Sequence, residues 1–149
     1  MGFKEVKTGY RGSKPQDTVD LSPVCATAWF TWKDGNTNFE DRSCLFVSLD
    51  GGMLVIGGKK PIGVTVQDNT AFAPGAQKVA LNGLVIVQSG VTETMASGLK
   101  ASGKTLQHSQ KSGQLVSKRT FSSKSKGFTI VDLIPDPDEK VNVKVKVIL

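Results

Sequence analysis

The side chains of this sequence that could do chemistry are few and stand far apart. His108 is the only histidine, and neither of the two cysteines, Cys25 and Cys44, lies near it. A catalytic set needs a nucleophile or an acid beside a general base, and a lone imidazole in a Ser, Gln and Lys-rich turn supplies one group only. No Gly-x-Ser-x-Gly elbow occurs. The sequence therefore predicts no catalytic residues and no enzyme, with His108 in a solvated loop.

Two glycine-rich stretches invite comparison with phosphate-binding loops. Residues Gly57-Gly58-Lys59-Lys60 lack the Gly-x-x-x-x-Gly-Lys-Ser/Thr spacing. No helix is expected after them to offer its N-terminus to a phosphate. We therefore interpret this stretch, like Gly51-Gly52, as a turn between strands, and we predict no cofactor.

The carboxylates between residues 132 and 139 could be sought as metal ligands. They stand around Pro135 and Pro137, which stiffen the segment, and their spacing does not follow the EF-hand pattern. A zinc site needs four ligands, which two cysteines and one remote histidine do not provide. The sequence therefore predicts no metal site, a solvated turn before the last strand, and free thiols in the chain interior.

Positive charge is the one chemical feature that stands out. The formal net charge is +6, which favours an acidic partner but is moderate for a dedicated nucleic-acid binder. No acidic residue lies between Thr94 and Val131, and Phe121 and Phe128 are the only aromatics there, too few to favour stacking on bases. An acidic protein surface is therefore the favoured partner. The predicted partner-binding residues are Lys4, Lys7, Tyr10, Arg11, Lys14, Lys100, Lys104, Lys111, Lys118, Arg119, Lys124 and Lys126.

Short alternating stretches separated by glycine turns must position these side chains. Residues 24–32 alternate with Phe30 and Trp32 on one face, and Asp34-Gly35 after them is a hairpin signal. A second hairpin is predicted at Asp50-Gly51-Gly52, between strands at 45–49 and 53–56. Residues 62–66 predict another strand. Residues 78–87 predict a strand interrupted at Asn82-Gly83 by a tight turn or a bulge.

The rest of the chain continues this pattern. Residues 90–104 hold the single expected helix, of one or two turns, because Gly98 should end it early. In residues 140–149, Val141, Val143, Val145 and Val147 share one face, which is typical of a half-buried antiparallel strand. The sequence predicts an all-β fold, a small antiparallel barrel or sandwich.

Two segments of the chain echo one another. Residues 44–87 and 105–149 repeat the same Leu, Ser, Gly and Val spacings, so the fold is expected to contain an internal two-fold repeat of a β unit. Residues 1–22 are polar and aperiodic, which predicts an extended N-terminal arm before one β domain at 23–149. Without an apolar run long enough to cross a bilayer, or a hydrophobic signal core, we expect a chain made in the cytoplasm that spans no membrane.

The order of passages from residue 45 onward resembles a known family. The passages are Gly63-Val-Thr-Val66, Ala73-Pro-Gly-Ala76 leading into 79–87, Met95-Ala-Ser-Gly98, Leu106 with Gly113-Gln-Leu-Val116, a strand from Gly127, and a Val/Lys strand at the C-terminus. This order resembles the small β-rich head-decoration (capsid cement) proteins of tailed bacteriophages, including capsid-fibre-like proteins. The N-terminal 40 residues, with Trp29 and Trp32, depart from the usual shorter start.

The resemblance implies a structural virion protein on the outer surface of the head. Such a protein would bind the major capsid protein, often as a homotrimer, and cement neighbouring capsomers. Many weak, identical contacts on a shell combine by multivalency, so each contact can be small.

Two other functions remain open on the sequence. A tail-tube or baseplate β subunit would polymerise into rings instead of decorating a shell. A small nucleic-acid-binding β-barrel would use the Lys-rich segment 100–126, and its affinity would collapse with salt on DNA of any sequence. Direct nucleic-acid binding is the less favoured of these readings.

Overall fold

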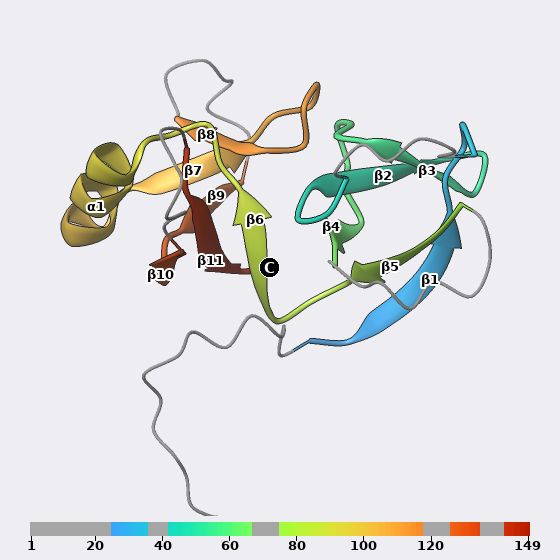
Figure 1. The fold of residues 1–149 in the computed structure, drawn as a ribbon, viewed down its shortest axis with the longest axis horizontal. Helices are drawn as coiled ribbons and strands as arrows, with labels where there is room; N and C mark the ends of the chain where they lie inside the picture. The colour runs from blue at the N-terminus through green and yellow to red at the C-terminus, as the bar shows by residue number, and fades with distance from the viewer. Residues whose placement is uncertain (1–24, 36–41, 67–74, 118–125, 135–141) are drawn as a thin grey trace, which may run out of the picture.

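The computed structural model describes residues 25–35, 42–66, 75–117, 126–134 and 142–149. The arm predicted at residues 1–22 lies outside these ranges. The described residues form short antiparallel strands in three sheets and one helix, so the all-β prediction is confirmed at the level of fold class (Figure 1).

Five strands form the first sheet. In hydrogen-bonded order they are β1 (Thr27–Thr31), β5 (Ala76–Ala80), β4 (Gly63–Thr65), β2 (Phe46–Asp50) and β3 (Met53–Ile56). All four neighbouring pairs are antiparallel. Among the described residues, Trp32 and Leu54 form a single parallel bridge between the two edges of the sheet. The sheet therefore curls towards a barrel without closing into one.

The hairpin predicted at Asp50-Gly51-Gly52 is confirmed. Strands β2 and β3 pair directly, with Asp50 opposite Met53. Gly51 and Gly52 take φ of +62° and +82°. Positive φ at both central residues is what a two-residue type I′ turn requires, and glycine supplies it without a Cβ clash.

The turn predicted at Asp34-Gly35 is present, but it does not pair strand β1 with the next described strand. Gly35 has φ of +79° and donates its N–H to the carbonyl oxygen of Trp32 at 3.1 Å. However, β1 pairs with β5, about 45 residues later, and not with the next strand β2. Trp32 and Phe30 pack with Val79 of β5 in a small core, so burial of these rings outweighs the local turn signal.

Two three-stranded sheets make up the second half of the chain. One has the order β10 (Asp132–Ile134), β11 (Lys144–Ile148), β6 (Leu84–Gln88), and the other has the order β8 (Leu115–Ser117), β7 (Thr105–His108), β9 (Gly127–Thr129). All of these pairs are antiparallel. A parallel bridge between Ser89 and Leu115 links the two sheets. Strand β6 lies between the first sheet and the remaining strands (Figure 1).

Asn82-Gly83 neither makes a hairpin turn nor bulges a continuous strand. Strands β5 and β6 on its two sides belong to different sheets and do not pair with one another. Gly83 has φ of +91°, and its carbonyl oxygen accepts the N–H of Leu149 at 2.9 Å. The prediction of a turn or bulge is therefore replaced by a bend that carries the chain from one sheet to the next.

The helix α1 (Glu93–Ser102) is longer than the one or two turns predicted. The Thr92 hydroxyl accepts the N–H of Met95 at 3.3 Å, which caps the N-terminus. Gly103, at φ of +70°, ends the helix in the left-handed conformation. Ala96 is fully buried, so capping and packing outweigh the cost of Gly98 inside the helix. Among the described residues, no helix is long and apolar enough to cross a membrane.

The alternation predicted at the C-terminus is confirmed where the structure describes it. Val143, Val145 and Val147 are buried, while Lys144 and Lys146 are half-buried on the other face of β11. Val141 lies outside the described residues. The three valines join a core cluster that also takes in Phe46 of β2 and side chains from β4 to β9, so strands of both halves pack on the same apolar interior.

The internal repeat has a partial counterpart in the topology. Strands β3, β2 and β4 are ordered as β8, β7 and β9 are, with a hairpin pair and a third strand beyond its first member. The first sheet then continues into β5 and β1, whereas the described part of the second stops at β9. The repeat of residues 44–87 at 105–149 therefore stays a prediction.

Candidate functional site

A hollow between the two halves of the chain is an open concave site among the described residues. Its volume is about 690 Å³. We call it the His108 hollow, and it is lined by Phe46, Lys59, Pro61, Ile62, Gly63, Leu81, His108, Gln110, Lys126, Phe128 and Leu149. The lining comes from β2, the 59–63 segment, β7 and β9, so elements far apart in the sequence build it.

His108 does not lie in a solvated loop, and that prediction is wrong. It is the last residue of β7 and is only 7 % exposed. Its Nε2 atom lies 2.9 Å from the carbonyl oxygen of Gly58, and its ring centroid lies 5.5 Å from that of Phe46. A carbonyl oxygen can only accept, so Nε2 carries the proton and donates. The imidazole therefore orients the 57–60 turn and packs on an aromatic ring.

Backbone hydrogen bonds hold the walls of the hollow together. The Gly58 N–H donates to the Gln110 carbonyl oxygen, and the Phe46 N–H donates to that of Gly113, both at 2.8 Å. These two bonds dock the β7–β8 turn on the first sheet. The approach is so close that a Cβ atom on Gly57 would stand 2.1 Å from the Gln110 oxygen. These contacts tie the segment that carries Lys59 to the β7–β8 turn.

Two lysines supply the charge of the hollow. Lys59 follows the Gly57-Gly58 turn, and Lys126 immediately precedes β9, with its Nζ atom 5.1 Å from the centroid of the Phe128 ring. No aspartate or glutamate side chain stands among the lining residues. The arrangement can attract and orient an anion. Lys59 was not predicted as a binding residue, because the glycines beside it were interpreted only as a turn between strands.

The described members of the predicted basic set lie at several places in the fold. Lys104 immediately precedes β7 and Lys111 lies beyond its other end, while Lys126 stands next to the His108 end because Gly127 pairs with Gln107. Lys100 is in the last turn of α1, where its Nζ atom lies 3.7 Å from Asp132 Oδ1. The remaining predicted partner-binding residues lie outside the described part of the chain: Lys4, Lys7, Tyr10, Arg11, Lys14, Lys118, Arg119 and Lys124.

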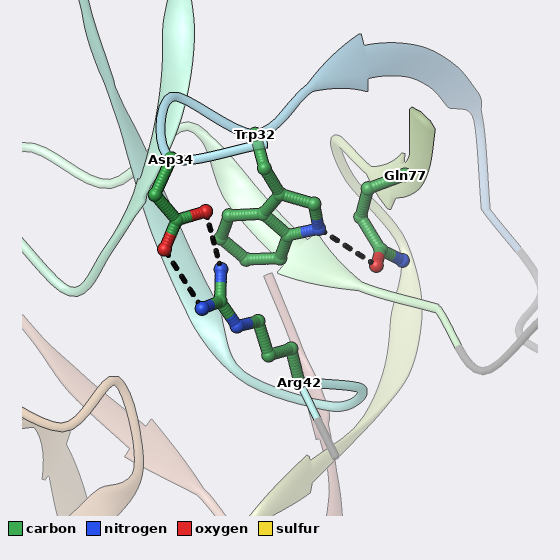
Figure 2. A network of polar contacts seen from close by, with 4 residues as sticks. All are labelled: Trp32, Asp34, Arg42 and Gln77. Carbon is green, nitrogen blue, oxygen red and sulfur yellow. Dashed lines mark hydrogen bonds and ion pairs between the residues drawn. The ribbon is translucent and has the colours of Figure 1, made fainter. Parts of the chain in front are cut away.

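A separate polar network covers the small core of the first sheet (Figure 2). The Arg42 guanidinium lies 4.8 Å from the centroid of the Trp32 ring and donates to both carboxylate oxygens of Asp34, at 3.0 and 2.8 Å. The Trp32 indole N–H donates to Gln77 Oε1 at 3.3 Å. Because the contacts of this cation and this indole are made within the chain, we assign the network to stability.

The two cysteines carry free thiols in different surroundings. Cys44 is buried, as predicted, whereas Cys25 is half-buried. Burial raises the pKa of the Cys25 thiol, and the positive charge of Lys78 opposes that rise. No group of three or more His, Cys, Asp or Glu side chains suited to a metal ion occurs in the ranges that the structure covers.

Thiol labelling should report these surroundings. Since the thiolate is the reactive form, Cys25 is expected to react with iodoacetamide at pH 8 more slowly than free cysteine, and Cys44 only on unfolding. Lys78→Met should slow Cys25 further by removing the charge that favours the thiolate. Lys100→Met, a lysine change elsewhere, should leave the rate unaltered. Mass spectrometry gives both rates, and faster labelling of the Lys78→Met chain would contradict the assignment.

Comparisons with known proteins give no relative. A scan against protein-family models, a search of curated proteins and a search of solved structures each found no match. The resemblance to head-decoration proteins therefore rests on the order of elements and the spacing of Gly and Val alone.

Proposed function

We propose that the chain is a structural protein that binds the outer surface of an assembled bacteriophage head and cements neighbouring capsomers. The observation that carries the proposal is the correspondence between the resembling passages and short structural elements. Gly63 begins β4, Gly127 begins β9, and the Val/Lys passage forms β11. The passage through Met95 lies in α1, between β6 and β7. Each of these four passages of the resemblance therefore coincides with a strand or a helix of the structure.

The surface of the described residues also suits adhesion. Large apolar side chains are exposed singly over several elements, at Leu49, Met53, Leu81, Met95, Val131 and Ile148. Leu49 and Met53 flank the β2–β3 turn, where a rigid type I′ hairpin presents them. Contacts of this size are weak one by one, and many copies on a shell would add them together. The proposal includes a homotrimeric state of the chain and direct binding to the major capsid protein.

The lysine positions bear on the competing function. A nucleic-acid-binding barrel needs a continuous basic surface along the phosphate backbone. Lys104 and Lys111 stand at opposite ends of β7, and Lys100 is paired with Asp132. The positions of Lys100, Lys104 and Lys111 therefore favour separate electrostatic contacts with a protein surface over a nucleic-acid groove.

Binding to isolated undecorated heads tests the proposal. The chain is expected to sediment with heads assembled from the major capsid protein encoded in the same genome, to saturate, and to stay unbound in the presence of unassembled subunits. A fluorescently labelled duplex of arbitrary sequence serves as the competing partner. Tight DNA binding that falls steeply between 50 and 200 mM salt, about 10³-fold or more, without binding to heads would favour the nucleic-acid alternative instead.

Deleting residues 1–20 should weaken head binding and spare the fold. A polar segment that orders on a neighbouring subunit adds contact area only after binding. We expect the apparent affinity for heads to fall about tenfold while the circular-dichroism spectrum and the urea midpoint stay unchanged. Equal occupancy of heads by the full and the shortened chain would show that the arm takes no part.

A further inference from the structure

We propose that the His108 hollow binds a small organic anion, an apolar body of drug-like size bearing one acidic group. This site goes beyond head binding and does not depend on it. The inference rests on the size of the hollow, the nature of its walls, the sign of its charge and its rigidity.

Size and lining match a ligand pocket. A volume of about 690 Å³ lies within the range of roughly 300–1,000 Å³ that is usual for small-molecule sites. Ile62 and Leu81 supply aliphatic surface in the lining, and behind them the edges of Phe46 and Phe128, only 2 % and 5 % exposed, form an aromatic pair with ring centroids 5.1 Å apart. Such walls favour an aromatic or aliphatic body over a bare inorganic ion, which would leave the apolar surface wet.

The charge of the lining selects an anion. Its ionisable side chains are Lys59, Lys126 and His108, so the two lysine ammonium groups outnumber the single main-chain carboxylate of Leu149. A concave, partly apolar site concentrates the field of such cations. The ammonium of Lys126 lies by the Phe128 ring, so an aromatic acid could place its ring on the wall and its acidic group near a lysine.

The walls are organised in advance. His108 donates to the Gly58 carbonyl, and the Gly58 N–H donates to the Gln110 carbonyl, so the segment that presents Lys59 is tied to β7 and its turn. A site that needs little ordering loses less free energy on binding than a loose surface does.

The test uses 8-anilinonaphthalene-1-sulfonate, an aromatic anion, with uncharged N-phenyl-1-naphthylamine as its matched probe. Fluorescence titration of the intact chain should show one saturable site that prefers the sulfonate about tenfold. Lys59→Met and Lys126→Met should each raise the Kd about threefold, and the double variant about tenfold. Lys104→Met, at the opposite end of β7, should leave the Kd unchanged.

A second variant tests the volume and not the charge. Leu81 lines the hollow and is 39 % exposed, so Leu81→Trp can fill the space without removing a buried contact. It should weaken sulfonate binding at least tenfold with an unchanged urea midpoint. If the Leu81→Trp chain does not fold, the Lys59→Met and Lys126→Met variants test the proposal without it.

Competition identifies the kind of occupant. Phenylacetate should displace the sulfonate, and the acidic peptide hexaglutamate should not. Displacement by the peptide alone would assign the hollow to an acidic segment of a partner protein and overturn the proposal. Non-saturable fluorescence, or a Kd insensitive to the double lysine variant, would overturn it as well.

Discussion

Replacing Trp32 by alanine is expected to lower the free energy of unfolding by about 3–5 kcal/mol. The side chain is 1 % exposed and packs with Val47, Leu54 and Val79 in the core of the first sheet. Its loss would leave a cavity where the two edges of the sheet meet. The substitution would also remove the indole N–H that donates to Gln77 Oε1 and the ring beneath the Arg42 guanidinium. Urea unfolding followed by far-ultraviolet circular dichroism measures the change.

Trp29→Ala is the matched control for this substitution. Trp29 lies on the same strand, β1, but is only half-buried and does not belong to the buried core. Its replacement should cost about 1 kcal/mol, as is usual for a site outside the core. Equal losses at Trp29 and Trp32 would contradict the assignment of the small core to Trp32.

Gly57→Ala is expected to destabilise the chain by about 2–5 kcal/mol, through two separate penalties. Gly57 has φ of +74°, where a Cβ atom costs about 1–2 kcal/mol. The added atom would also lie 2.1 Å from the Gln110 carbonyl oxygen and 2.6 Å from its carbon, and overpacking of this kind costs about 1–3 kcal/mol. Backbone must move to relieve the contact, which would part the β7–β8 turn from the first sheet.

Gly51→Ala separates the two penalties. Gly51 has φ of +62°, and nothing lies within 4 Å of the position of its Cβ atom. It should cost the backbone term alone, about 1–2 kcal/mol. Urea midpoints give both values, and amide hydrogen exchange should show lost protection at Gly58 in the Gly57→Ala chain only. Identical effects of the two substitutions would show that the turn and the sheet are not in close contact.

Local signals in the sequence predicted local structure well. Asp50-Gly51-Gly52 fixes a hairpin through backbone geometry that glycine alone adopts without cost, and alternating valines fix the buried face of β11. Each signal spans a few residues and needs no distant partner. The all-β class follows from the same kind of information.

Pairings and burial decided by distant residues could not be predicted. Strand β1 pairs with β5 because Trp32 and Phe30 need a common core with Val79, and no spacing near Asp34-Gly35 reports that need. His108 is buried because β7 runs beside the 57–60 turn. The His108 hollow combines residues from 46 to 149, so it exists only once the sheets are assembled.

The positions of Lys104 and Lys111 also depend on how the chain folds and not on their spacing in the sequence. A segment without acidic residues suggested one basic surface, but strand β7 places Lys104 and Lys111 at its two ends. Charge along a sequence becomes charge on a face only through the path of the backbone.

Electron cryo-microscopy of undecorated heads incubated with the purified chain tests the central claim most directly. The proposed function predicts added density, of about the size of this chain, at symmetry-related positions on the outer surface, where neighbouring capsomers meet. Bare heads, in a sample where the chain remains folded and in excess, would contradict it.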